Sequence, residues 1–134
     1  MLEKISEKLE IRMKLSTLWI VIMFNMLFAD VLTLFIPESL NEIVSGTTAV
    51  EITPELMLVM ALIIEIPILM IFLSRFLKRK INRWLNIVAA VITIAFVAGG
   101  GSLVPHYIFF AAIEVICALA IIWSSWKWAE ESNE

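Results

Sequence analysis

The sequence predicts an all-α integral membrane protein, a four-helix bundle in up-down order, and three observations lead to this prediction. Of the 134 residues, 61% are hydrophobic, and the mean hydropathy of +0.96 is far above that of a soluble domain. The apolar residues form runs at about 15–36, 56–74, 84–104 and 106–126. Each run is long enough for a helix to span a bilayer. No long linker divides the chain, so we expect one transmembrane domain, residues 1–134.

The first fourteen residues are charged but periodic. Apolar side chains recur at helical spacing, and the charged residues occupy the other faces: Leu2, Ile5, Leu9 and Met13 form the apolar set. This pattern predicts an amphipathic N-terminal helix that either lies at the membrane interface or runs on into the first span. An anchoring or partner-docking role is the functional alternative.

The connections carry recognisable start and stop signals. Pro37 ends the first span, and the acidic stretch that follows has room for one or two turns of amphipathic helix. Thr53, Pro54 and Glu55 then predict a helix start, with a hydroxyl N-cap, proline in the first turn and an acid near the positive end of the helix dipole. Residues 75–83 hold five basic residues and no acid, which predicts a tight turn between two spans.

Small and polar residues form one stripe on each of the last two spans. The stripe on the third span is Asn82, Asn86, Ala89, Thr93, Val97 and Gly100. The stripe on the fourth span is Tyr107, Ala111, Glu114, Ala118 and Ser125. Helices approach closely in lipid where side chains are small, so both stripes are expected to face the inside of the bundle.

The distribution of charge predicts the orientation. All ten Lys and Arg residues fall in the N-terminal helix, the connection between spans two and three, and the C-terminal tail. Four spans place these segments on one side, so the positive-inside rule predicts that both termini are cytoplasmic. The expected location is the cell (plasma) membrane. The tryptophans lie at the same helix ends, where indole rings favour the headgroup region: Trp19, Trp84, Trp123, Trp126 and Trp128.

Three acids interrupt the apolar runs. Asp30, Glu65 and Glu114 each lie in a different span, roughly 9 to 15 Å below the outer surface at 1.5 Å of rise per residue. The spans contain no Lys or Arg. Each acid must therefore be neutral, face water or a bound cation, or accept hydrogen bonds from polar neighbours such as Asn25, Thr93 or Tyr107. The similar depths favour an outward-opening acidic pocket, with Glu65 beside Pro67 as its central group.

Such a pocket would bind or translocate a proton, a cation or a lipophilic amine. Alternatives are an intramembrane proton-transfer enzyme that uses two of the acids, neutral acids that only hydrogen-bond between helices, and an accessory subunit without a site. His106 is a candidate proton relay at the outer mouth. The scattered methionines and Cys117 are typical of a core, so no metal site is expected. No cofactor and no nucleic-acid partner are expected, and the oligomeric state stays open.

The arrangement of these features resembles known small membrane proteins. Four spans, an acid late in span one and an acid before a proline in span two resemble the DoxX-like and EXPERA-type four-helix proteins. Residues 18–30, 65–75 and 82–87 also resemble those of an uncharacterised family of prokaryotic four-span proteins. The EXPERA likeness implies that Asp30 and Glu65 are pocket acids for a lipophilic amine or a sterol, with proton shuttling during isomerisation in one branch.

Overall fold

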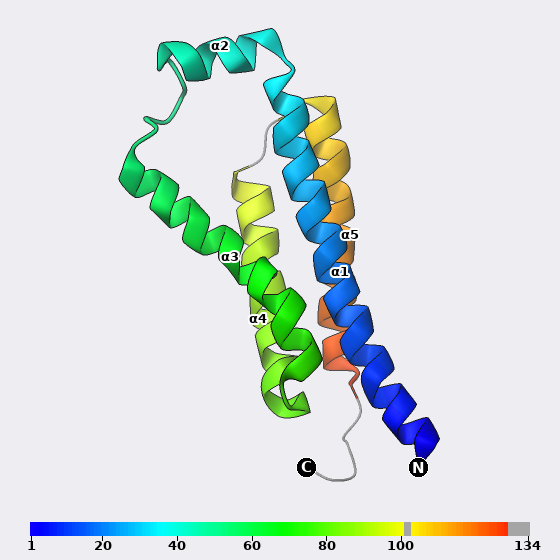
Figure 1. Cartoon of the computed structure of the whole chain (residues 1–134). Helices are drawn as coiled ribbons and strands as arrows, with labels where there is room; N and C mark the ends of the chain where they lie inside the picture. Colours follow the sequence, from blue (N-terminus) through cyan, green and yellow to red (C-terminus); the bar gives the residue numbers. More distant parts are fainter. Residues whose placement is uncertain (101–102, 129–134) are drawn as a thin grey trace.

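The computed structural model describes residues 1–100 and 103–128, and within these ranges its regular structure is entirely α-helical. Its helices are α1 Leu2–Leu34, α2 Pro37–Ser45, α3 Pro54–Phe76, α4 Arg79–Gly99 and α5 Pro105–Trp126 (Figure 1). Four of them, α1, α3, α4 and α5, are long and apolar enough to cross a membrane. The predicted all-α class with four candidate spans is therefore confirmed for the described part of the chain.

The N-terminal amphipathic helix and the first span are one continuous helix. α1 is 33 residues long, which corresponds to about 50 Å at 1.5 Å per residue. The sequence between Leu2 and Leu34 contains neither Pro nor Gly, the residues that most often interrupt a helix. Of the two arrangements predicted for the N-terminal residues, the structure shows the one that runs on into the span.

The ends of the other helices follow most of the predicted signals. The Thr53 side chain accepts a hydrogen bond from the Leu56 N–H at 3.1 Å, which confirms the N-cap of α3. The turn between α3 and α4 is shorter than predicted, because the backbone is extended only at Leu77 and Lys78. α4 begins at Arg79, ahead of the predicted start of the third span at residue 84, because arginine and lysine are good helix formers.

The four long helices form a bundle that is closed at one end and open at the other. α1 and α4 each pack against both α3 and α5. Figure 1 shows α3 crossing the bundle at an angle, so that its N-terminal half diverges from the other long helices. The buried residues of α3 are Pro67, Met70 and Ser74, which all belong to its C-terminal half.

The core fills the closed end. Its fully buried side chains include Leu15, Trp19 and Ile22 of α1, which pack against alanines of the last two helices. The predicted inward stripes are confirmed for most of their members: Asn82, Asn86, Ala89, Thr93 and Val97 are buried on α4, whereas Gly100 is exposed, and Tyr107 and Ala111 on α5 are partly buried. Glu114, Ala118 and Ser125 are buried on α5. Small side chains at these positions let the helices approach closely.

A buried polar network joins three helices at the closed end. The Trp19 indole Nε1 donates to Asn86 Oδ1 at 2.8 Å, and Ser74 Oγ donates to the same oxygen at 3.2 Å. Asn86 Nδ2 donates to the carbonyl and the side-chain oxygen of Asn82, at 2.8 and 2.6 Å. Asn82 Nδ2 donates to the Ser74 carbonyl at 2.8 Å. The network therefore ties α1, α3 and α4 together through side chains that are 0% exposed.

This network corrects one expectation about the tryptophans. Trp19 is completely buried, so its ring is part of the core and does not lie at a headgroup surface. The reason is that its N–H finds a buried acceptor on α4. Trp128, just after α5, is also buried, at 6% exposed, whereas Trp84, Trp123 and Trp126 are each more than half exposed.

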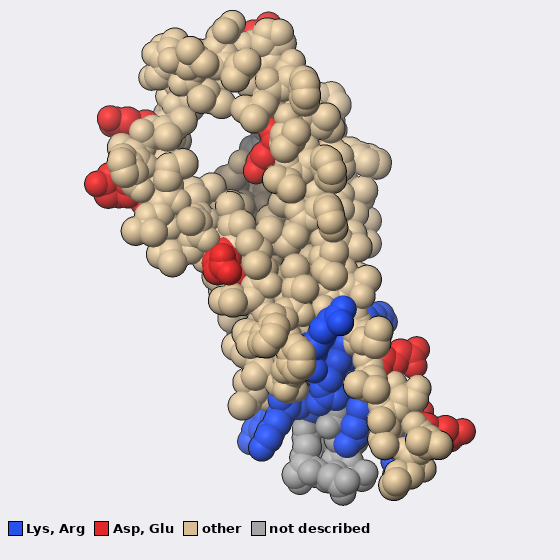
Figure 2. Space-filling view, viewed as in Figure 1, with Lys and Arg blue, Asp and Glu red and all other residues tan. Residues whose placement is uncertain are grey.

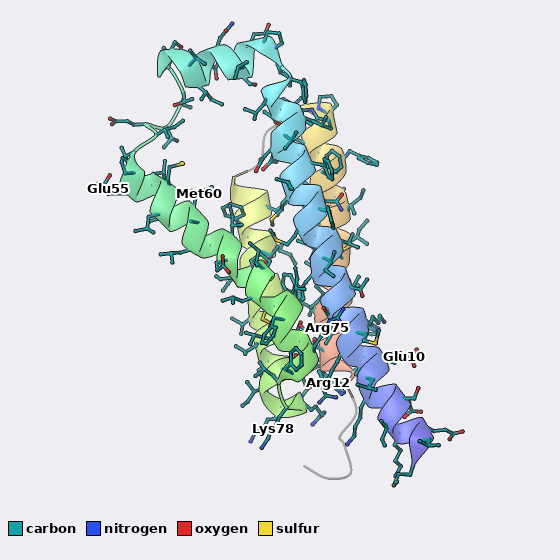
Figure 3. All side chains as sticks on the ribbon, in the orientation of Figure 1. Glu10, Arg12, Glu55, Met60, Arg75 and Lys78 are labelled. Carbon is teal, nitrogen blue, oxygen red and sulfur yellow. The ribbon has the colours of Figure 1, made fainter. Side chains whose placement is uncertain are left out.

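Arginines at the closed end bind backbone and hydroxyl oxygens. Arg75 Nε donates to Ser16 Oγ at 2.9 Å, which links α3 to α1. Arg79 Nη2 donates to the Trp128 carbonyl at 2.8 Å, and Arg83 Nε donates to the Ser125 carbonyl at 2.8 Å. The bonds from Arg79 and Arg83 attach the start of α4 to the last residues of α5 and to Trp128 just after it. Figure 3 shows Arg12 and Arg75 where α1 and α3 meet, and Figure 2 shows the Lys and Arg side chains gathered at this end.

We expect Asn86→Ala to lower the free energy of unfolding by about 1–3 kcal/mol, because it leaves buried donors of Trp19 and Ser74 without an acceptor. Asn25→Ala is the matched control, since the Asn25 amide donates to the Val21 carbonyl of its own helix and joins no second helix through that bond. Unfolding of both variants in detergent, followed by circular dichroism, measures the difference. Equal stability of the two variants would contradict a structural role for the network.

Candidate functional site

A cavity of about 420 Å³ lies at the open end of the bundle. Its wall is formed by all four long helices and is largely apolar. The lining residues are Met23, Met26, Leu27, Ala29, Asp30, Met60, Ile64, Phe96, Val97, Gly100, Tyr107 and Glu114. Figure 2 shows an opening between α3 and α1 with acidic side-chain atoms at its edge. The cavity exists because α3 diverges from its neighbours at this end.

Helical spacing explains which side chains reach the cavity. Met23, Met26 and Asp30 follow one another at steps of three and four on α1, so they share a face. Tyr107 and Glu114 are two turns apart on α5 and also share a face. The cavity therefore brings two carboxyl groups from different helices together with a phenol.

The two carboxyl groups lie in different environments. Glu114 is only 4% exposed, and its Oε1 has no hydrogen-bond partner within the described part of the chain. Asp30 remains exposed at the cavity wall. A buried polar atom without a partner costs free energy, so the position of Glu114 is not explained by stability. Buried polar groups of this kind are expected where a ligand or a proton completes their bonding.

The outer ends of α1 and α5 are joined beside the cavity. Thr33 Oγ1 lies 3.0 Å from His106 Nε2 and donates its single hydroxyl proton to the Ala29 carbonyl at 2.7 Å. With the Thr33 hydroxyl proton used in that bond, His106 Nε2 is the donor of the hydrogen bond between the two side chains, and Thr33 Oγ1 accepts it. His106 holds the two helices together at the mouth, and it is not one of the cavity's lining residues.

Glu65, predicted as the central acid, does not line the cavity. Met60 and Ile64 are the α3 residues that do, and they are one helical turn apart. Glu65 directly follows Ile64, so its side chain is rotated by about 100° around the helix axis, and it is exposed. The predicted convergence of three acids is therefore reduced to the pair Asp30 and Glu114.

The other two predicted polar neighbours also bond elsewhere. Asn25 Nδ2 donates to the Val21 carbonyl at 2.7 Å. Thr93 Oγ1 donates to the Ala89 carbonyl at 2.8 Å. Both side chains thus bond to carbonyls one turn earlier in their own helices, a common arrangement for short polar side chains inside helices. Neither lines the cavity with the acids, whereas Tyr107 does.

Sequence reasoning missed the apolar part of the site. Met23, Met26 and Met60 were interpreted as scattered core residues, yet all three line the cavity. The helical spacing of Met23 and Met26 from Asp30 was the signal that could have identified two of them. The position of Met60 depends on the angle at which α3 crosses the bundle, which no local pattern indicates.

Comparison with known proteins identifies a family for this chain. Residues 3–133 match a family described as a family of unknown function (DUF6326). No curated protein and no solved structure matches the chain. The match confirms the predicted resemblance to an uncharacterised family, and the comparisons show no relationship to DoxX-like or EXPERA proteins.

We expect Glu114→Met to raise the free energy of unfolding by about 1–3 kcal/mol, because it removes a buried polar group whose Oε1 lacks a hydrogen bond within the described residues. The same change at an exposed acid of the α2–α3 connection, Glu51→Met, is the control and should have little effect. Thermal unfolding in detergent measures both. A clear loss of stability in Glu114→Met would show that Glu114 is a structural residue.

Proposed function

The chain belongs to a family of unknown function (DUF6326), and we propose that it is a multi-pass membrane protein that binds a lipophilic cation in the cavity at its open end. One observation carries the proposal: Asp30 and Glu114, from two different helices, line a single cavity whose other walls are mostly apolar. Carboxylates attract the cationic group of a ligand, and an apolar wall packs against its hydrocarbon part.

The chemistry of the wall favours an organic cation such as an amine. Met23, Met60 and Phe96 offer polarisable and aromatic surface to an apolar body. The ring of Tyr107 adds a face that attracts cations. Hard metal ions such as Ca²⁺ need six or more oxygen ligands, and no group of three His, Cys, Asp or Glu side chains that could hold a metal is found among residues 1–100 and 103–128. The volume of about 420 Å³ is in the range of small-molecule sites.

The opening between α1 and α3 supports lateral access from the bilayer. Figure 2 shows this opening on the side of the molecule, between two helices that are apolar enough to span a membrane. Lipophilic cations concentrate in the bilayer near its surface, so a side opening suits them. We infer that the ligand reaches Asp30 from the outer leaflet.

The orientation forms part of the proposal. Lys and Arg side chains gather at the closed end, as Figure 2 shows. By the positive-inside rule, this end lies in the cytoplasm, the cavity opens toward the outside, and the spans alternate in direction with both termini cytoplasmic. The three acids then lie within the outer half of the membrane, and the cell membrane is the proposed location.

A second candidate function is proton transfer to a bound substrate. The observation that favours it is the contrast between buried Glu114 and exposed Asp30, since unlike environments assign acid and base roles to two carboxyl groups. This candidate shares the cavity and its residues with the binding proposal. It differs in requiring that the chemical structure of the bound molecule change.

Binding of radiolabelled tetraphenylphosphonium to the purified protein in lipid nanodiscs tests the proposal. Asp30→Asn and Glu114→Gln should each weaken binding about tenfold or more, because each removes a negative charge from the cavity. The charge of this probe does not depend on pH. A loss of binding in either variant therefore reports a change in the protein and not in the probe.

Glu65→Gln is the matched control, because it changes an acid of α3 that lies outside the cavity lining. It should bind the probe like the natural chain. Unchanged binding in the double variant of Asp30→Asn and Glu114→Gln would refute the proposed site. Equal losses in Glu65→Gln and Glu114→Gln would indicate a general effect of charge and count against the cavity as the binding site.

Cysteine labelling in intact cells tests the orientation. In a Cys117→Ser background, Ala49→Cys in the connection before α3 should react with a membrane-impermeant maleimide, and Lys78→Cys in the turn before α4 should not. Both positions are exposed. Labelling of Lys78→Cys without permeabilisation, with Ala49→Cys protected, would reverse the orientation and place the cavity on the cytoplasmic side.

A further inference from the structure

The N-terminal part of α1 projects beyond the bundle. Ile11 is the first side chain of α1 that packs against the core, and the fully buried residues begin at Leu15. Figure 1 shows the N-terminal end of α1 extending away from the other helices. Figure 3 shows the Glu10 side chain on this projecting part, pointing outward. We call residues 2–13 the N-terminal segment.

An apolar stripe runs along the N-terminal segment and is left uncovered by the described part of the chain. Leu2, Ile5, Leu9 and Met13 are 82%, 47%, 55% and 53% exposed. Steps of three and four residues place them on one face. A shallow hollow follows this face, lined by the same four residues together with Ser6 and Glu10.

The stripe points away from the core. Ile11 is the residue of the N-terminal segment that packs against the core. Leu9 precedes it by two residues, so their side chains are about 200° apart around the helix axis. The bundle therefore holds the segment by one face and presents the opposite, apolar face outward.

The continuity of α1 prevents this stripe from lying flat on a membrane. α1 is a single helix of 33 residues, about 50 Å long, whereas the hydrocarbon core of a bilayer is about 30 Å thick. A span that crosses the bilayer therefore carries the N-terminal segment out into water in the direction of the span. Exposure of an apolar stripe to water is unfavourable, and such exposed apolar surface is typical of a binding site for a protein partner.

The charges beside the stripe indicate which partner fits. At 100° per residue, Lys8 lies on one flank of the stripe, and Glu3 and Glu10 lie on the other. In a parallel pair of helices, opposite flanks of the two copies face each other. A second copy of this segment thus brings a basic flank against an acidic flank on both sides of the seam.

We propose that the N-terminal segment forms a parallel homodimer contact with the same segment of a second copy. Two copies inserted in the same orientation, as proposed above, have parallel α1 helices, so no rearrangement is needed. The contact continues into the membrane along exposed residues of α1. Phe24 and Val31 lie about three and five helical turns beyond Met13 and are both exposed.

Disulfide trapping in native membranes tests this contact on the full chain. In a Cys117→Ala background, Leu9→Cys should form a disulfide-linked dimer under mild oxidation at least tenfold more efficiently than Glu7→Cys. Glu7 is the matched control, because it is exposed in the same segment but lies on the face away from the stripe. A dimer of twice the chain mass identifies the partner as a second copy.

A substitution that disrupts the stripe provides the second arm. Leu9→Glu should convert dimers into monomers, as counted by single-molecule photobleaching in nanodiscs. The monomer should still fold, as its circular dichroism spectrum would show, because Leu9 belongs neither to the core nor to the residues packed against it. Equal trapping of Leu9→Cys and Glu7→Cys, trapping to a band of another mass, or a dimer that survives Leu9→Glu would overturn the proposal. Tetraphenylphosphonium binding by Leu9→Glu shows separately whether the cavity is intact.

Discussion

The rest of the structure depends on the hydrogen bond from the Trp19 indole to the Asn86 amide, which joins α1 to α4. Lipid is as apolar as a leucine side chain, so burial of apolar surface does not drive helices together inside a membrane. Small residues and polar contacts must do so, and they are concentrated at the closed end through Asn82, Asn86 and Ser74. At the open end, the side-chain bond between Thr33 and His106 ties α1 to α5, while α3 diverges from both.

Much of the fold was predictable because it depends on local properties of the sequence. The lengths of the apolar runs indicated the candidate spans, and the hydroxyl of Thr53 followed by a proline indicated the start of α3. The stripes on α4 and α5 were also predictable, because a period of 3.6 residues fixes which side chains share a face. Tyr107 and Glu114 were assigned to the inside of the bundle for this reason.

The rest depends on how the helices are rotated and tilted, which the sequence does not state. The position of Glu65 within its helix indicates a depth but no direction around the helix axis, and α3 turns Ile64 toward the cavity instead. An indole ring suits both a headgroup surface and a core. Only the presence of Asn86 on another helix decides that Trp19 is buried.

Because α1 is one unbroken helix, a tilt of the helix moves both of its ends. The packed region around Trp19 lies between Asp30, toward the C-terminal end of α1, and the N-terminal segment at the other end. A tilt of about 10° around Trp19 would move Asp30 by roughly 3 Å and swing the N-terminal segment in the opposite direction. A tilt of α1 that changes the width of the cavity therefore also changes the direction in which the N-terminal segment projects.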